Sequence, residues 1–273
     1  MSYWLRAGQL AVARSANAES VSHIATALTL VADWPESKAR ERQELNLRTV
    51  LGPALVATRG HAADETVENY EHCRHLMRTT DDQNHWEVVL FGLAAAYYNR
   101  GACRQFSDIA HEFLQEAKHQ GTAVALCVGH RLVSAASSTS GNFRDALING
   151  ELAFRHYDRD NHARLAWRYA HDIGVAAASQ WAIGAWHQGL IGTANVAHQE
   201  AFAIAARLNH HTTTGYALYY NGVLAAFFRR DFAALAEHAT RLLEHGLRYD
   251  LPQWRALASA LEGRRTSTCW KSR

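Results

Sequence analysis

Apolar stripes with helical spacing recur about every forty residues along this chain, and this repeat constrains its fold most strongly. The stripes place apolar residues at i, i+3, i+4 and i+7 in the segments that follow residues 101, 141, 189 and 230. Each stripe follows a short polar junction, and the junction residues are Gly60, Gly101, Gly141, Gly189 and Arg230. A looser copy of the junction lies at Gly8. The intervals of 41, 40, 48 and 41 residues predict helical hairpins whose apolar faces are covered by neighbouring hairpins.

The predicted fold class is all-α, an α-solenoid of about six tetratricopeptide-like helical hairpins. The sequence GNFRDALINGELAF, which starts at Gly141, fits the turn and second helix of a tetratricopeptide unit. An alanine-rich chain with only three prolines also favours helices over a β architecture with many turns. The longest interval contains residues 154–174, whose aromatic, Arg, Asp and His content predicts an ordered connection rather than a flexible linker.

One repeat domain is expected over residues 1–262, followed by an irregular basic tail at residues 263–273. The tail has lost the helical periodicity and carries four basic residues and no acid, namely Arg264, Arg265, Lys271 and Arg273. The net charge of +2 for the whole chain becomes −2 without this tail. A near-neutral body argues against a protein that binds nucleic acid, because such binding requires clustered basic residues.

The cysteines and the apolar runs give no sign of a redox motif or of a membrane segment. Cys73, Cys103, Cys127 and Cys269 are too far apart to form a CxxC pair, so free thiols are expected. The longest apolar run, at residues 88–98, is too short to span a bilayer, and no signal peptide is apparent at the start. We therefore expect a cytoplasmic protein that does not bind membranes.

Motifs for metal or nucleotide chemistry are weak or missing. His72 and His75 lie four residues after Glu68 and Glu71, so each pair shares a helix face, but a zinc site needs three or four ligands. Neither the phosphate-binding Gly-Lys-Ser/Thr loop nor the Gly-x-Ser-x-Gly motif is present. We expect no metal, no cofactor and no catalytic residue, and an enzyme that uses the histidine-rich surface is a distant alternative.

A recognition surface is the remaining functional prediction. In the usual tetratricopeptide register, the first helix of each hairpin lines the concave face, where aromatic and polar groups suit peptide capture. The candidate concave-face residues are Phe91, Tyr98, Asn99, Arg131, Ser179, His187, Tyr220 and Phe227. The alternative that the aromatic members of this set pack between helices stays open. Another alternative is a small-molecule sensor with an aromatic pocket near Trp181, Trp186, Tyr216 and Tyr220.

Several strings together resemble a known family. They include YWLRAGQLAVARSANAESVSHIATAL at residues 3–28, LGPALVATRGHAADETVENY at residues 51–70 and LAWRYAHDIGVAAASQWAIGAWHQGLIGTA at residues 165–194. These strings and residues 215–254 resemble the tetratricopeptide-like C-terminal region of bacterial proteins that join a class III adenylate/guanylate cyclase to a STAND-type AAA ATPase. The resemblance extends from about residue 3 to about residue 261.

This family often carries an Asp-Pro-Gly-Val element after a stretch with His and Tyr. Asp172, Gly174 and Val175 match the element, and Ile173 stands where the family has proline. The preceding candidate loop residues are His162, Tyr169 and His171.

The resemblance implies a non-catalytic scaffold or sensor region, because neither the cyclase domain nor the ATPase phosphate loop is present. The implied partner is a protein or peptide, for example a cyclase or ATPase module, and the oligomeric state is left open. The tail at residues 263–273 does not match the helix expected there, so a truncated or frame-altered copy is a further hypothesis.

Overall fold

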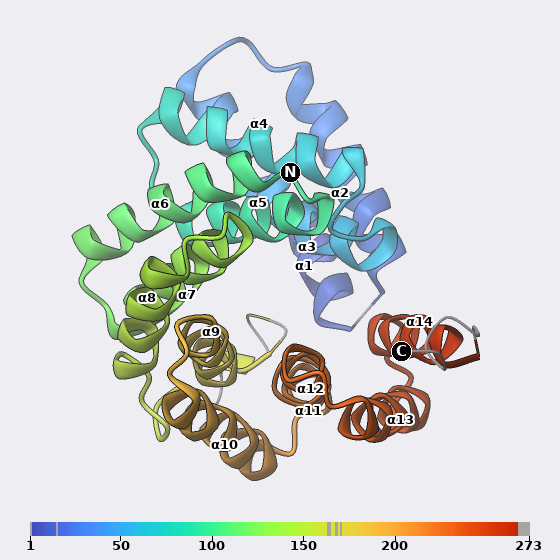
Figure 1. Ribbon diagram of the computed structural model, residues 1–273. Coiled ribbons are helices and arrows are strands. Elements are labelled where there is room, and N and C mark those ends of the chain that lie inside the picture. The colour runs from blue at the N-terminus through green and yellow to red at the C-terminus, as the bar shows by residue number, and fades with distance from the viewer. Residues whose placement is uncertain (1, 15, 163–164, 167–168, 170, 267–273) are drawn as a thin grey trace. The chain divides into compact units, whose positions relative to one another are not determined.

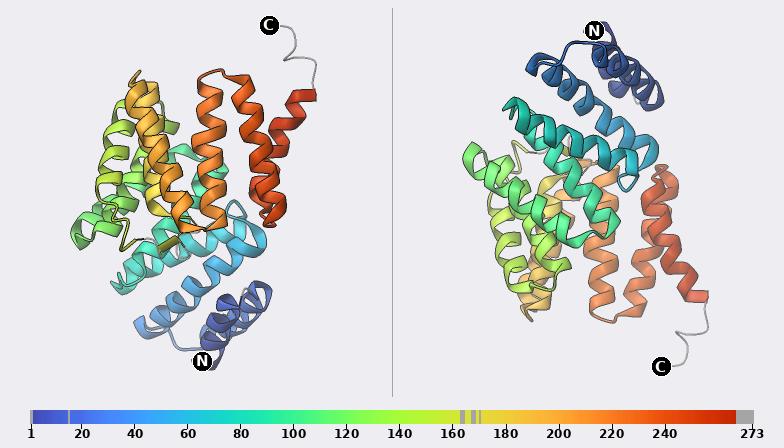
Figure 2. Two further views of the ribbon diagram at one scale, coloured as in Figure 1. Left: turned by 90° about the horizontal axis from the view of Figure 1, so that it is seen from below. Right: turned by 90° about the horizontal axis from the view of Figure 1, so that it is seen from above.

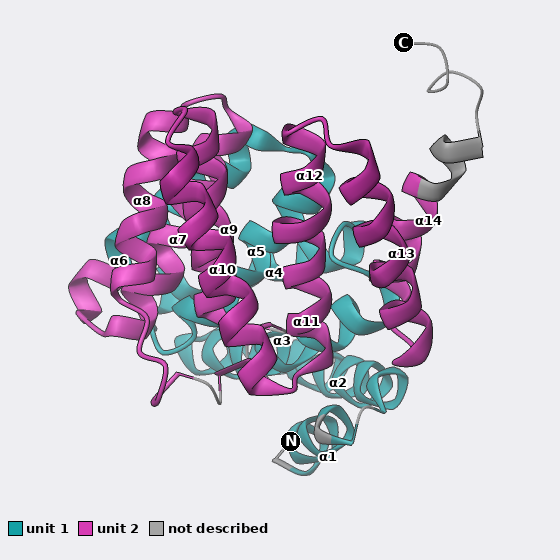
Figure 3. Ribbon diagram, turned by 60° about the horizontal axis from the view of Figure 1, so that its bottom comes forward, with its two compact units in different colours: residues 1–116 teal, residues 117–273 magenta. Residues whose placement is uncertain are grey.

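The computed structural model describes residues 2–14, 16–162, 165–166, 169 and 171–266. These residues form helices and connecting loops, with no β-strand among them, so the predicted all-α fold class is confirmed (Figure 1). The chain divides into two compact units, residues 1–116 and 117–273 (Figure 3). The boundary falls inside one helix, and the pattern of consecutive helices continues on both sides of it.

Consecutive helices pack on one another in unit 1, as expected for an α-solenoid. Its helices are α1 (Ser2–Ala13), α2 (Asn17–Ala32), α3 (Lys38–Arg59), α4 (Asp64–Thr80), α5 (Trp86–Arg100) and most of α6 (Cys103–Gln120). Buried aliphatic residues join α2 to α3, with Ile24 and Leu47 fully inaccessible to solvent. The ring of Trp86 lies 4.8 Å from that of Phe113, which fixes α5 against α6.

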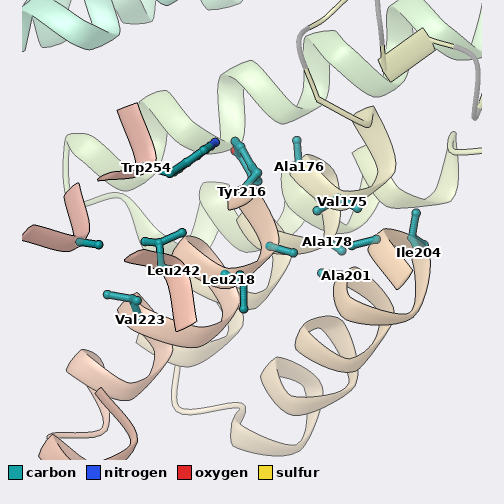
Figure 4. Packing of buried hydrophobic residues seen from close by; sticks show 13 residues of the cluster. Val175, Ala176, Ala178, Ala201, Ile204, Tyr216, Leu218, Val223, Leu242 and Trp254 are labelled. Atoms are coloured by element: carbon teal, nitrogen blue, oxygen red, sulfur yellow. The ribbon is translucent and has the colours of Figure 1, made fainter. Parts of the chain in front are cut away.

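Unit 2 repeats this arrangement with one irregular helix. Its helices are α7 (Ala123–Thr139), α8 (Phe143–Arg155), α9 (Ile173–His187), α10 (Ile191–Leu208), α11 (His211–Ala217), η2 (Leu218–Val223), α12 (Leu224–Phe228), α13 (Phe232–Arg248) and α14 (Pro252–Thr266). The segments α11, η2 and α12 form one continuous rod in which η2 is a π-helical turn. Figure 4 shows Tyr216, Leu218 and Trp254 in the core that this rod shares with its neighbours.

Each of the five predicted junctions is confirmed as a turn between two helices. The backbone there is left-handed or at least has positive φ, at 93° for Gly60, 69° for Gly101, 80° for Gly141, 74° for Gly189 and 56° for Arg230. Glycine suits such a turn because it has no Cβ to clash at positive φ. Together with α1 and α2, these pairs make six hairpins within the described chain, and α14 follows them.

The junction predicted at Gly8 is wrong, because Gly8 lies inside α1. A Cβ at this position would lie 2.5 Å from Cδ1 of Ile24, so the glycine allows α1 and α2 to approach closely. The predicted boundary at residue 262 also differs from the structure, since α14 continues to Thr266. The remainder of the predicted tail, residues 267–273, lies outside the described residues.

Candidate functional site

The predicted concave-face residues of unit 1 all lie on α5. Tyr98 is 40% exposed, and the edge of its ring meets Phe106 at 5.4 Å between centroids. Asn99 is exposed, and its Nδ2 donates to the carbonyl oxygen of Ala95 one turn earlier. Phe91 is half-buried. Tyr98 therefore packs between the helices of its hairpin and is also partly exposed. Packing between helices was the alternative left open for the aromatic candidates.

In unit 2, the predicted face residues do not form one surface. Arg131 and Tyr220 are half-buried, and the Tyr220 ring stacks on Tyr216 at 4.3 Å. Ser179 is only 1% exposed, so its prediction as a partner-contacting residue is wrong. Ser179 lies on α9, which is apolar around most of its circumference. The periodicity of the sequence therefore does not show which of its residues face the core.

Ser179 instead belongs to a buried hydrogen-bond network that the sequence did not reveal. Its Oγ donates to the carbonyl oxygen of Val175 at 2.7 Å and accepts from Nδ2 of Asn221 at 2.8 Å. The Oδ1 atom of Asn221 lies 2.9 Å from Nδ1 of His198. Asn221 sits in the π-helical turn, so the network holds α9, η2 and α10 together. Burial lowers the pKa of His198, which favours its neutral form.

The predicted loop residues surround the start of α9. Asp172 is fully buried and caps this helix, accepting from the backbone nitrogens of Gly174 and Val175 at 2.9 Å each. The hydroxyl of Tyr157 donates to its other oxygen at 3.1 Å. Ile173 is the first helical residue, a position where proline is well tolerated. The match to the Asp-Pro-Gly-Val element is therefore a helix cap.

The other loop residues are packed rather than presented to a ligand. His162 is 6% exposed, and its Nδ1 accepts from the backbone nitrogen of Asp158 at 3.1 Å. Tyr169 is buried, and the His171 ring stacks on Tyr216 at 4.4 Å. These contacts pack His162, Tyr169 and His171 against their neighbours in the described part of the connection between α8 and α9.

Burial makes this region unfavourable for nucleophilic chemistry. It raises the pKa of the Asp172 carboxyl and of the Tyr157 hydroxyl. It also raises the pKa of the nearby Cys127 thiol to about 12, so the sulfur stays protonated at neutral pH. A nucleophilic cysteine needs the opposite shift toward the thiolate. The cluster therefore stabilises the start of α9.

An exposed apolar surface lies at the turn end of two neighbouring hairpins in unit 2, and we call it the turn edge. It consists of Leu190, Ile191, Phe227 and Phe232, which are 46%, 43%, 45% and 50% exposed. The turns between α9 and α10 and between α12 and α13 point the same way (Figure 2, left).

Three aromatic rings are in contact next to the turn edge. His187 at the end of α9 stacks on Phe143 at the start of α8, with 4.0 Å between ring centroids and 7° between planes. Its other neighbour is Phe228 of α12, at 4.8 Å. These contacts join three hairpins and hold the turns that carry the turn edge next to one another.

Two cavities lie among the described residues of unit 2 that carry the site, and neither of these two is lined by the four aromatic residues predicted to form a pocket. One, of about 380 Å³, lies between α10, α11 and α13, and the other, of about 180 Å³, lies beside Arg159 and Arg207. Tyr216 is 7% exposed and packs edge-on against Trp254, while Trp181 stacks on Phe154. Tyr216 and Tyr220 therefore contribute to the core, while Trp181 and Trp186 are half-buried.

The candidate metal ligands near His72 are engaged elsewhere. The Nε2 atom of His72 lies 3.0 Å from a carboxylate oxygen of Glu44, and Cys73 is buried. Among the described residues, no three His, Cys, Asp or Glu side chains come together in a way that could hold a metal ion. Likewise, none of the described helices combines the length and apolarity needed to cross a membrane.

Comparison with known proteins gives one distant relative. No known protein-family model matches the chain. Over 253 residues, the chain is 25% identical to an uncharacterized protein of Rhizobium meliloti (strain 1021). The match covers 91% of this chain and 24% of that protein, so the chain spans about a quarter of the length of its relative. The resemblance to cyclase and ATPase proteins stays a prediction.

Proposed function

We propose that this chain is a non-catalytic helical-repeat module that binds a protein partner through the turn edge. The observation that supports the proposal is the grouping of four large apolar side chains, each more than two-fifths exposed, on adjacent hairpin turns. Grouped exposed apolar residues mark interaction surfaces more often than scattered ones do. The ring stack of Phe143, His187 and Phe228 keeps these turns in place before binding.

The charges around the turn edge favour a partner with acidic residues. Arg229 and Arg230 are exposed on the turn between α12 and α13, and Arg144 is exposed beside Phe143 at the start of α8. The nearby carboxylate of Asp231 accepts from the backbone nitrogen of Ala234 at 3.0 Å, so it is engaged in capping α13. An amphipathic helix whose apolar face is bordered by Asp or Glu would complement this surface in both respects.

The resemblance to cyclase/ATPase proteins supports a role in signalling. In this proposal the partner is a cyclase or ATPase module, and the chain regulates it as a scaffold or sensor. Regulation would require the chain to bind two states of the module with unequal affinity, because equal affinity shifts no equilibrium. The chain itself supplies no turnover, so the purified protein should show only background cyclase and ATPase rates.

Binding to purified cyclase and ATPase modules, measured by biolayer interferometry, tests the proposal. We expect Phe227→Glu to weaken binding at least tenfold, because it places a charge at the apolar turn edge. Leu247→Glu is the matched control, since Leu247 is 59% exposed on α13 but lies far from its N-terminal turn. Equal affinities for the two variants would show that the turn edge is not the binding surface, and absence of binding to either module would overturn the signalling role.

Small-molecule sensing is a second candidate function. The observation that favours it is the cavity of about 380 Å³ between α10, α11 and α13, rather than the aromatic group that the sequence suggested. This volume lies within the range of small-ligand sites.

A further inference from the structure

A cavity of about 380 Å³ in unit 2 is lined partly by small residues. Its walls come from α10, from α11 with the first residue of η2, and from α13, and consist of Phe202, Ala205, Ala206, Thr214, Ala217, Leu218, His238 and Arg241. Three of these residues are alanines, which cannot fill the space between Phe202 and Leu218. The cavity opens to solvent, since its lining residues Ala206 and Arg241 are exposed, and its volume of about 380 Å³ lies within the range of small-ligand sites.

The polar groups of the cavity lie mainly on α13. The guanidinium of Arg241 is exposed, and its nearest carboxylate partner, Glu237, approaches no closer than 3.9 Å. Such an exposed pair one helical turn apart contributes little, so Arg241 can exchange it for another anion at small cost. The hydroxyl of Thr214 adds a hydrogen-bonding group on the α11 side.

His238 completes the lining and packs against the π-helical turn. A Cβ at Gly222 would lie 2.9 Å from Nδ1 of His238, so only a glycine there allows the imidazole to lie so close. Burial and the neighbouring charges of Arg241 and Arg229 lower the pKa of His238, against the opposing effect of Glu237 and Asp231. The imidazole is therefore neutral near pH 7, and Arg241 carries the positive charge of the cavity.

We propose that this cavity binds a small amphipathic carboxylate, with its apolar body between Phe202, Leu218 and the alanines and its carboxylate at Arg241. The occupant follows from charge complementarity, since the lining residues include a cation and no acid. The inference rests on the ligand-sensing candidate and is independent of partner binding at the turn edge, which uses other residues.

Isothermal titration of the full chain with 3-phenylpropionate and with its uncharged analogue 3-phenylpropionamide tests the proposal. We expect the acid to bind at least tenfold more tightly than the amide. The variant Arg241→Gln should lose this preference, whereas Arg248→Gln, which removes an equal charge from the same helix, should retain it. Equal affinity for the acid and the amide, or binding of neither, would overturn the proposal.

A blocking variant locates the bound probe. Ala206 lies at the exposed rim of the cavity, so Ala206→Trp should close the entrance and abolish binding of 3-phenylpropionate while the melting temperature stays unchanged. Ala203→Trp is the control, because Ala203 is exposed on the same helix but does not line the cavity. Wild-type affinity in Ala206→Trp would place the probe elsewhere and refute the site. Partner binding should be the same in both variants, so this result is separate from the test of the turn edge.

Discussion

Opposing electrostatic effects set the pKa of the Asp172 carboxyl. Three donors, the backbone nitrogens of Gly174 and Val175 and the hydroxyl of Tyr157, stabilise its ionised form. Complete burial opposes ionisation more strongly, and the pKa of Asp172 rises above its ordinary value of 3.8. The cap of α9 thus depends on a carboxylate that is costly to keep charged.

This shift predicts an unusual pH dependence. A carboxyl whose pKa is higher in the folded than in the unfolded state contributes stability below about pH 3.8, and the contribution is lost as the pH rises through the raised pKa. The wild type should therefore lose stability relative to Asp172→Asn as the pH rises from 3.8. Urea denaturation midpoints of the two proteins across this range measure the difference.

Asp158 provides a control of opposite sign. It is exposed, and hydrogen bonds from Asn161 and from the backbone nitrogen of Asp160 lower its pKa. The stability that this group contributes is present above its ordinary pKa and is lost as the pH falls. Asp158→Asn should therefore change the pH profile in the opposite direction, and profiles of the same sign for both variants would contradict our explanation of Asp172.

The pair α8 and α9 shows how two elements pack without space between their backbones. A Cβ added to Gly184 would lie 2.5 Å from the backbone nitrogen of Leu147, and one added to Gly150 would lie 2.6 Å from Cα of Trp181. Backbone atoms cannot rotate away as side chains do. Glycines on facing helices thus set the distance between α8 and α9.

Gly184→Ala should therefore destabilise the protein by about 1–3 kcal/mol, which is typical of overpacking a close contact. Gly192→Ala on α10 is the matched control, because no atom lies within 4 Å of the Cβ that it introduces. Both substitutions lower the conformational entropy of the unfolded chain by the same amount, so this effect cancels when the two variants are compared. Thermal denaturation measures the stability of both variants. Equal melting temperatures would show that α8 and α9 can move apart without loss of stability.

At the scale of the whole molecule, partly buried and buried histidines couple stability to pH. Burial is the largest cause of a lowered pKa at seven described histidines, namely His61, His72, His130, His162, His198, His210 and His238. They occur in both units, and several accept or donate hydrogen bonds inside the fold. The folded chain is therefore poorer in bound protons than the unfolded chain at mildly acidic pH.

Stability should accordingly decrease as the pH falls below about 6.5, the ordinary pKa of histidine. A group with a lowered pKa in the folded state stabilises the protein above its unfolded pKa, and each full proton of difference changes the unfolding free energy by about 1.4 kcal/mol per pH unit. Urea denaturation of the full chain at pH 7.5 and 5.5 measures the loss.

Single variants assign this effect to the histidines with a lowered pKa. His198→Asn should reduce the pH dependence, because burial lowers the pKa of His198 and its Nδ1 lies 2.9 Å from Oδ1 of Asn221, whereas His119→Gln, at an exposed position on α6, is the control. Constant stability between pH 7.5 and 5.5 would contradict the prediction.

Much of the fold was predictable because helices and hairpin turns are encoded locally. The positions of Gly60, Gly101, Gly141 and Gly189 mark turns through conformational preference, and Arg230 was found only because it continues the period. Gly8 was misassigned because a glycine in a close helix contact looks the same in sequence as one in a turn.

The candidate site was less predictable, because it depends on contacts between distant residues. Ser179, Asn221 and His198 come from three helical segments, and no local pattern pairs them. The sequence by itself determined the helices, their order and most of their turns, since periodicity and backbone preference act over a few residues. Only the tertiary structure decided which residues are buried, where the turn edge lies and where α10, α11 and α13 leave a cavity, because each depends on how whole helices pack.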